Sequence, residues 1–419
     1  MQFVAAHTEG SEQMATTKGM LDGYKVLDFT QVLAGPTTTR YMVEMGAEVV
    51  KVEIAPNGDI SREVPFLRDG RSGYYVQQNR GKKSLCLNLK HPGGAAIIRA
   101  LIPRFDVLVE NFAPGVIRRL GFDYEAVKAL NPKIIMCSIS TFGQNGPLAT
   151  RPGYDFIGCA YSGVLSMIGE PDGLPVLPQV GVGDISTGVH GLTAILAALL
   201  HRERTGEGQF VETSLLDCYF SYNDLTVQTV SLSRGANLPR RSGSHHFGMA
   251  ALGVFNGKSC PILIMAGTQH QFGYLCEAMG RPELPNDPRF KTNADRMVNN
   301  EELKRIIQEW FDSIPCDDEV FRRFDECRVP YAPVLAIEQA MAHPHLRDNE
   351  IVRTINDRFL GDFDVPGFPL RFSASTRHPQ LGAPTLGEHN RAILSDYLGY
   401  SPERIEALER DGVLHQGPR

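Results

Sequence analysis

Short apolar segments alternate with helix-like segments along the first 140 residues, and this alternation constrains the fold more than any other feature. Strands are predicted at 24–29 and 48–53, with a helix at 37–45 between them and a turn that carries Gly35 and Pro36. Strand, turn, helix and strand form the opening βαβ unit of a parallel sheet. The alternation continues through further predicted strands at 84–89, 106–110 and 133–138. The pattern predicts an α/β fold with a Rossmann-like parallel sheet.

The turn after the first strand argues against one frequent use of such a sheet. Residues 30–36 lack the G-x-G-x-x-G pattern that brings a dinucleotide pyrophosphate onto a helix N-terminus. An NAD-dependent oxidoreductase is therefore disfavoured.

The chain divides into regions of different composition. A polar tail at 1–20 precedes a large Rossmann-like domain predicted at 21–235. A Gly-, Ser- and His-rich loop and linker at 236–249 leads into a smaller α+β domain at 250–345, which opens with a hairpin around an Asn-Gly turn. A linker and two polar-faced helices occupy 346–419.

The balance of charge narrows the class of partner. With 42 basic and 48 acidic residues the net charge is -6, which argues against a general nucleic-acid or membrane-surface binder. No apolar run approaches the roughly 20 residues of a membrane helix. The first 20 residues lack the basic start and apolar core of a secretory signal. We therefore expect a cytoplasmic protein.

The eight cysteines favour the same compartment. They form no CxxC pair and no Cys/His cluster with zinc-ligand spacing, so no metal site is expected. Cys86 and Cys137 fall inside predicted strands, where a buried thiol is the usual explanation. Free thiols are typical of a reducing environment.

One carboxylate lies on a glycine-rich stretch ahead of a long helix. Asp184 stands in Gly181-Val-Gly-Asp-Ile-Ser-Thr-Gly188, and the helix is predicted at about 186–204. The local pattern favours an N-cap, because an Asp there accepts backbone N–H bonds and is kept ionised by the helix dipole. The alternative is a nucleophile, for which Gly183 and its neighbours leave room.

Other polar groups each allow two interpretations. The basic residues Arg80, Lys82 and Lys83, with Arg118 and Arg119, suit a phosphate-bearing ligand at the strand ends, or form a solvated basic face.

The remaining candidates lie on a loop and ahead of a predicted helix. His245 and His246 offer metal ligands on a Gly-rich loop but lack a third ligand in sequence, so a surface loop is favoured. Tyr154 and Asp155 stand at the start of a predicted helix at 154–168. In the structural interpretation, Tyr154 packs against its neighbours and Asp155 caps the helix.

The chain resembles the class III CoA-transferases, the family of formyl-CoA transferase and carnitine CoA-transferase, nearly from end to end. The resemblance rests on the order and number of matching segments, which are VLDFTQVLAGP (26–36), GAEVVKVE (46–53), NRGKKSLCLNL (79–89), DVLVENFAPG (106–115), RLGFDYEAVKALNPKII (119–135), GDISTG (183–188), ALLHRERTGEGQ (198–209), VPYAPV (329–334) and LGEHN (386–390).

The resemblance implies an activity: CoA moves from an acyl-CoA thioester to a carboxylic acid. Asp184 would attack the thioester, form a mixed anhydride and then an aspartyl-CoA thioester. It implies that the active-site positions are Gln31, Tyr154, Asp155, Gly183, Ser244 and His245. It implies that the CoA contacts are Ala34, Lys82, Asn111, Phe112 and Arg119, with Lys82 and Arg119 on phosphates.

The resemblance also implies an assembly and a lid. The family forms an interlocked homodimer whose large domain is built from both chain ends, so residues 346–419 are expected to return to it. Residues 242–248 resemble the family's glycine-rich lid. Coenzyme A enters as a substrate, and no permanently bound cofactor is implied.

The sequence departs from the family pattern at several positions. Formyl-CoA transferase has a glutamine where this chain has Leu33 and an arginine where it has Ile54, which weakens an assignment to oxalate. Protonated His245 and His246 would favour a dicarboxylic acid. Related racemases use a histidine where this chain has Tyr154, which disfavours α-proton exchange. An acyl-CoA racemase is kept as the alternative activity, beside a non-catalytic CoA-binding protein.

Overall fold

The structure, a computed structural model, describes residues 19–375 and 381–417, in two compact units. The first unit comprises residues up to Ile139 with Gly188–Glu212 and Arg353–Arg419, and the second comprises Ser140–Thr187 and Thr213–Val352. This grouping differs from the predicted boundary at 235, because the chain leaves the first unit twice, after Ile139 and after Glu212, and returns to it twice. The C-terminal residues do group with the large unit. Residues 1–18 of the predicted tail lie outside the described residues.

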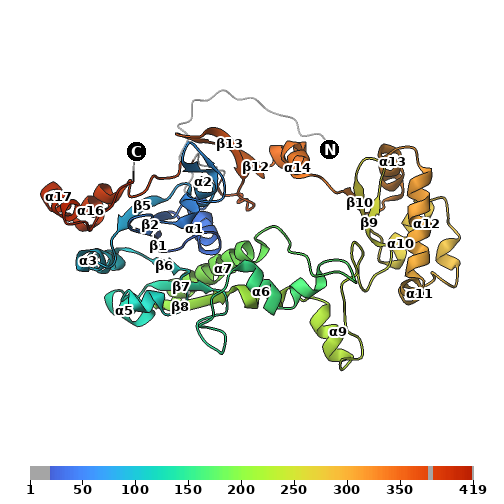
Figure 1. The fold of residues 1–419 in the computed structure, drawn as a ribbon, viewed down its shortest axis with the longest axis horizontal. Helices are drawn as coiled ribbons and strands as arrows, with labels where there is room; N and C mark the ends of the chain where they lie inside the picture. The colour runs from blue at the N-terminus through green and yellow to red at the C-terminus, as the bar shows by residue number, and fades with distance from the viewer. Residues whose placement is uncertain (1–18, 376–380, 418–419) are drawn as a thin grey trace. The chain divides into compact units, whose positions relative to one another are not determined.

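The first unit is organised by a six-stranded sheet (Figure 1). The strands follow one another in the spatial order β5 (Lys83–Leu87), β2 (Glu48–Ile54), β1 (Lys25–Asp28), β6 (Val107–Glu110), β7 (Ile135–Ser140) and β8 (Gln209–Ser214). Strand β1 pairs in parallel with β2 and β6, β2 with β5, and β6 with β7. This is the strand order of a Rossmann sheet. The predicted fold is confirmed.

Helices cover both faces of this sheet. Val26 on β1 joins a core with α1 (Ala34–Glu44) and the buried face of α7 (Val182–Thr205), whereas Leu27 joins a core with α3 (Pro92–Leu101). The second core also contains residues of α16 (Asn390–Leu398) and α17 (Pro402–Arg410). Neighbouring strand residues point to opposite faces, so each strand contributes to both cores.

Shorter elements complete the first unit. They are η1 (Ile60–Arg62), β3 (Leu67–Arg68), β4 (Arg71–Ser72), α2 (Gly73–Asn79), η2 (Ile102–Arg104), α4 (Val116–Arg119), α5 (Tyr124–Leu130) and β13 (Gly361–Pro366), with β12 (Val352–Asp357) paired to β13.

Helix α7 is, by length and composition, apolar enough to span a membrane, and it is the one such helix in the described part of the chain. Leu192, Ile195, Ala198 and Leu199 on this helix are buried in the first unit's core. Their burial is that of a core helix in a globular protein.

The second unit contains a smaller α+β core. The predicted hairpin is present as β9 (Leu252–Asn256) and β10 (Pro261–Met265), and β11 (Tyr331–Pro333) adds to β10. The helices packed there are α10 (Gln269–Ala278), α12 (Asn300–Ser313) and α13 (Asp317–Cys327).

The remaining elements of the second unit are shorter. They are α6 (Asp155–Tyr161), η3 (Val164–Met167), α8 (Leu215–Ser221), α9 (Thr226–Leu232), η4 (Leu284–Asn286), α11 (Asn293–Val298), α14 (Ile337–Ala342) and α15 (Pro344–Asp348).

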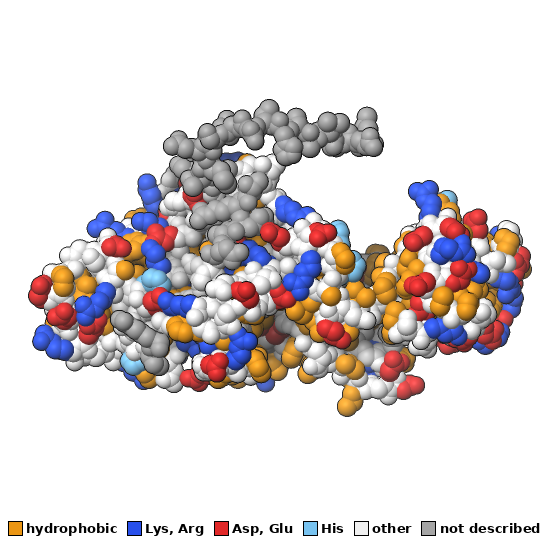
Figure 2. Space-filling view, turned by 90° about the horizontal axis from the view of Figure 1, so that it is seen from above, with side chains coloured by type: hydrophobic (Ala, Val, Ile, Leu, Met, Phe, Trp, Pro, Cys, Tyr) orange, Lys and Arg blue, Asp and Glu red, His pale blue; other side chains and the backbone are white. Residues whose placement is uncertain are grey.

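The surface carries charges of both signs, and the cysteines form no disulfides. Basic and acidic side chains are interspersed on the face drawn in Figure 2. All eight cysteines are free, and Cys86 and Cys137 are buried as predicted.

Candidate active site

In the first unit, polar residues gather where the parallel strands β1 and β6 end. The strand order reverses between these two strands, which is where ligands bind in open α/β sheets. Strand β1 leads into Gln31, and β6 leads into Asn111. The Asn111 side chain accepts a hydrogen bond from the Gln31 N–H (2.8 Å) and donates one to the Gln31 carbonyl (2.9 Å). The two loops are therefore joined at this point.

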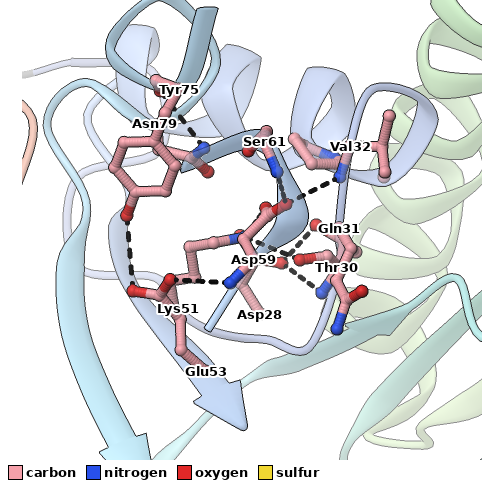
Figure 3. Close-up of polar contacts among 12 residues, drawn as sticks. Asp28, Thr30, Gln31, Val32, Lys51, Glu53, Asp59, Ser61, Tyr75 and Asn79 are labelled. Carbon is pink, nitrogen blue, oxygen red and sulfur yellow. Dashed lines mark hydrogen bonds and ion pairs between the residues drawn. The ribbon is translucent and has the colours of Figure 1, made fainter. Parts of the chain in front are cut away.

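A buried network of charges lies directly behind these loops (Figure 3). Lys51 pairs with Asp59 at 2.8 Å, Lys82 with Asp28 at 2.9 Å, and Arg62 with Glu53 at 2.7 Å. The network holds equal numbers of cations and anions, as buried charges require. Burial opposes the ionisation of Asp59, but Lys51 outweighs it and lowers the pKa of that carboxyl to about 2.

The structure corrects the expected role of Lys82. Its ammonium is buried, donates to Asp28 and, at 2.9 Å, to the Asn79 side chain. Burial lowers the pKa of Lys82 to about 8 despite the attraction of Asp28. A phosphate cannot reach this ammonium without breaking both bonds, so Lys82 supports the loop from within. This internal role of Lys82 cannot be predicted from its neighbours in the sequence, because Asp28 lies 54 residues away along the chain.

The other predicted CoA contacts lie near the same edge of the sheet. Ala34 is buried at the start of α1, and Phe112 is half-buried against the core, with its N–H donated to Glu110 (2.9 Å). Arg119 is exposed at the end of α4 and forms no ion pair with another described residue. Of the two predicted phosphate ligands, Arg119 alone is accessible in this unit.

In the second unit, the structure places Asp184 within a helix. Helix α7 begins at Val182, four residues before the predicted start, so Asp184 is its third residue and belongs to its first turn. The N-cap interpretation is wrong. The Asp184 N–H donates to the Asp155 carboxylate (3.3 Å), which comes from the start of α6.

Asp155 is also bound by a tyrosine that the sequence analysis did not single out. The Tyr219 hydroxyl donates to Asp155 at 2.5 Å and accepts the Gly183 N–H at 3.1 Å. Asp155 and Tyr219 are both buried. One carboxylate and one phenol therefore satisfy two N–H groups in the first turn of α7. Tyr219 lies in an ordinary apolar helix, where the sequence carries no mark of a polar role.

Asp184 is a half-buried carboxyl with an unusual ionisation equilibrium. Burial, together with the negative charge of Asp155, raises the pKa of Asp184 to about 7. We expected the helix dipole to lower the pKa of Asp184 and keep it ionised. The pKa is raised instead, because burial and the like charge of Asp155 outweigh the dipole. Strongly perturbed carboxyls are typical of functional sites.

Gly183 is required by close packing. A Cβ there would lie 2.0 Å from the Tyr219 ring and 2.4 Å from the Asp155 carboxylate. Gly183 does not adopt a positive φ. Tyr154, in contrast, is exposed immediately before α6, with 78% of its surface accessible. The structure thus brings together Asp155, Gly183 and Asp184, and leaves the Tyr154 ring in solvent.

The predicted lid is tied to a neighbouring strand. His246 N–H donates to the Leu252 carbonyl (3.0 Å) and Val254 N–H to the Ser244 carbonyl (2.9 Å). The His245 ring packs edge-on against Phe255, and burial lowers its pKa. The suggested protonated His245 is therefore disfavoured at neutral pH. Within the described ranges, no hydrogen bond joins Ser244 or His245 to Asp184.

Among the described residues, no group of three or more His, Cys, Asp or Glu side chains is placed to hold a metal ion. His245 and His246 therefore remain without further ligands in this part of the chain.

Comparisons with known proteins agree on one family. A model of CoA-transferase family III matches residues 21–390. The chain is 36% identical over 402 residues to succinyl-CoA:glutarate CoA-transferase of Mus musculus, covering 94% of this chain and 90% of that protein. It is 37% identical over 389 residues to acetyl-CoA:oxalate CoA-transferase of Acetobacter aceti, covering 91% and 97%.

A solved structure supports the same assignment. A CAIB/BAIF family protein from Brucella suis superposes with a TM-score of 0.79 at 32% identity, covering 91% of this chain and 100% of that one. The sequence match extends over nearly the whole chain, and so does the structural match. The chain belongs to CoA-transferase family III.

Proposed function

We propose that this protein transfers CoA from an acyl-CoA to a carboxylic acid through covalent intermediates on Asp184. The observation that carries the proposal is the raised pKa of Asp184, to about 7, beside the buried Asp155. A more basic carboxylate is a better nucleophile, and at this pKa a large fraction is ionised at neutral pH.

The reaction divides into two pairs of steps. An Asp184 oxygen attacks the thioester carbonyl, the carbon–sulfur bond breaks, and CoA thiolate leaves a mixed anhydride. The thiolate then attacks the Asp184 carbonyl carbon and releases the donor acid as its carboxylate. The acceptor carboxylate attacks the resulting aspartyl-CoA thioester and expels the thiolate. Finally the thiolate attacks the acceptor's carbonyl and restores the Asp184 carboxylate, so that no external proton or electron is consumed.

We propose a dicarboxylic acid as acceptor. Relatives that match most of this chain are named for glutarate, oxalate and mesaconate as partners of CoA transfer.

We also propose a cytoplasmic location. The free thiols support it, since disulfides are rare in the cytoplasm.

We further propose that the working form is a homodimer. Large apolar side chains are exposed in several segments of the second unit, among them Tyr154 (78%), Leu174 (86%), Val180 (59%), Phe220 (53%) and Leu232 (80%). Such exposure in a monomer is costly and marks an interaction surface. We propose that a second copy of the chain covers these residues, in agreement with the homodimer that the family resemblance implies.

The test is a panel assay. Succinyl-CoA, acetyl-CoA and formyl-CoA are each paired with mono- and dicarboxylic acids, and the product thioesters are identified by mass spectrometry. We expect one dicarboxylic pair to exceed all monocarboxylic pairs, and Asp184→Asn to lose at least about 10³-fold in kcat, the scale expected when a nucleophile is removed. Full activity of Asp184→Asn would overturn the mechanism.

A further inference from the structure

Val32 has a backbone conformation that its side chain disfavours. Its φ is 65°, in the left-handed region, where a β-branched residue is a true outlier. Such a residue persists only where the surrounding structure holds it, and such strain clusters at functional sites. Val32 lies between Gln31 and the start of α1, on the loop that leaves β1.

Side chains from a strand and two loops hold the backbone that leads into this residue. Val32 N–H donates to Asp59 at 3.2 Å, and Gln31 is bonded at both its N–H and its carbonyl by Asn111. The Thr30 carbonyl accepts a hydrogen bond from Lys51 at 2.6 Å. Four consecutive backbone polar groups thus have side-chain partners.

The groups that hold this loop are themselves fixed (Figure 3). Lys51 and Asp59 have 0% and 1% of their side chains exposed and pair at 2.8 Å. Asp59 also accepts the Ser61 N–H (2.9 Å), and its own N–H donates to Glu53 (3.2 Å). A buried, hydrogen-bonded ion pair of this kind moves little, because separation would leave two uncompensated charges.

One group on this loop stays free. The Gln31 side-chain amide makes no hydrogen bond to another described residue, although its backbone is bonded on both sides. The amide lies on the loop after β1, beside the loop after β6, at the point where ligands bind in such sheets. A fixed backbone with an unused donor and acceptor is the arrangement that a preorganised polar contact requires.

We propose that Asn111, Asp59 and Lys51 are positioning residues that form a clamp on the strained Val32 turn and thereby fix the Gln31 amide for a carbonyl oxygen of the acyl-CoA bound at this edge of the sheet. The strain at Val32 is a cost that the clamp offsets in order to set the direction of Gln31. The proposal rests on the proposed function, since the ligand is the acyl-CoA of that reaction. Asn111, expected from the resemblance to contact CoA, acts here through Gln31.

The test is Asn111→Ala, which removes both side-chain hydrogen bonds that hold the Gln31 backbone and leaves the strain at Val32 in place. We expect a kcat at least about fivefold lower, with KM for the acyl-CoA changed less than about twofold. In a Gln31→Ala background, Asn111→Ala should lower kcat by less than about twofold, because its effect passes through Gln31. Adding Val32→Gly to Asn111→Ala should restore at least about half of the lost kcat, because glycine adopts a positive φ without strain. Arg328→Gly, at a second positive φ (61°) at the end of α13, is the control and should restore none of it.

Crystal structures of Asn111→Ala, with and without Val32→Gly, separate this proposal from the proposed function. We expect residues 30–32 to relax and Gln31 to shift in Asn111→Ala, and both to return toward their original positions in the double variant. Wild-type kcat in Asn111→Ala, an equal loss in the Gln31→Ala background, or an unmoved Gln31 in Asn111→Ala would each overturn the clamp. Absence of CoA transfer by the wild-type protein would overturn the proposed function, while the crystal structures would still decide the clamp.

Discussion

The chemistry assigned to Asp184 depends on two neighbours. Asp155 contributes a negative charge and accepts the Asp184 N–H, and Tyr219 holds Asp155 with a 2.5 Å hydrogen bond. Without Asp155, burial alone would raise the pKa of Asp184, and less strongly. The nucleophile's basicity is therefore set partly by a residue that does not itself attack substrate.

The first prediction concerns pH. Since the ionised form of Asp184 is the nucleophile and its pKa is about 7, kcat/KM should rise with pH and level off above about 7. Asp155→Asn removes the like charge, so the midpoint should move to lower pH by about one unit or more. The measurement is kcat/KM between pH 5 and 9.

Matched variants make this prediction specific. Asp217→Asn changes an exposed carboxylate on α8 and should leave the midpoint in place. A midpoint of Asp155→Asn equal to that of the wild type would show that Asp155 does not influence the nucleophile's charge.

At the residue scale, the sequence is sufficient to select some site residues but not others, because the role of a polar side chain depends on partners that are distant along the chain. Asp184 could be selected because it stands in a segment that matches a family, and Asp155 because its position corresponds to an active-site position of that family. Lys82 was assigned to a phosphate because a Lys among basic neighbours is indistinguishable from a surface lysine until its partner is known. That partner, Asp28, lies on another strand. Tyr219 was missed because its hydroxyl has a role only once α8 packs beside α6.

At the scale of elements, the first turn of α7 is closely packed against side chains of α6 and α8. Gly183 lets Tyr219 and Asp155 approach the helix backbone. The glycine-rich sequence predicts a turn before the helix, whereas Gly183 and Gly188 lie inside the helix and allow close packing. Gly188, for example, approaches the Ala34 carbonyl, where an added Cβ would lie 2.5 Å away.

The second prediction compares two helical glycines. Gly183→Ala should destabilise the protein by about 1–3 kcal/mol through overpacking and lower kcat at least about tenfold. Gly273→Ala, in α10, meets no atom within 4 Å and should stabilise by up to about 1 kcal/mol with unchanged kcat. Denaturant unfolding and steady-state kinetics measure both. A Gly183→Ala variant as stable and active as Gly273→Ala would show that this turn tolerates displacement.

At the scale of the whole molecule, alternation of strands and helices was sufficient to predict the parallel sheet. Periodicity is local, so it identified β1, β2, β5, β6 and β7 without knowledge of their neighbours. It could not group the chain into units, because residues 140–187 and 213–352 associate across a long gap in sequence. The return of the C-terminal helices came from the resemblance alone.

The third prediction concerns assembly. The exposed apolar residues between Tyr154 and Leu232 in the second unit should be covered by a second copy, so light scattering should give twice the 46.2 kDa of one chain. Leu174→Glu and Leu232→Glu together should weaken the dimer, since each introduces a charge at an exposed leucine. Val298→Glu, also at a highly exposed apolar residue but on α11, is the control and should leave the mass unchanged. A monomeric wild-type protein at micromolar concentration would contradict the dimer.

The fourth prediction tests the covalent role of Asp184 most directly. With an acceptor acid labelled with ¹⁸O in its carboxylate, the mixed anhydride transfers one labelled oxygen to the Asp184 side chain in each turnover. Peptide mass spectrometry after turnover should therefore find the label on Asp184, and on no peptide when acyl-CoA is omitted. An unlabelled Asp184 after many turnovers, or label on Asp155 instead, would contradict the assignment of the nucleophile.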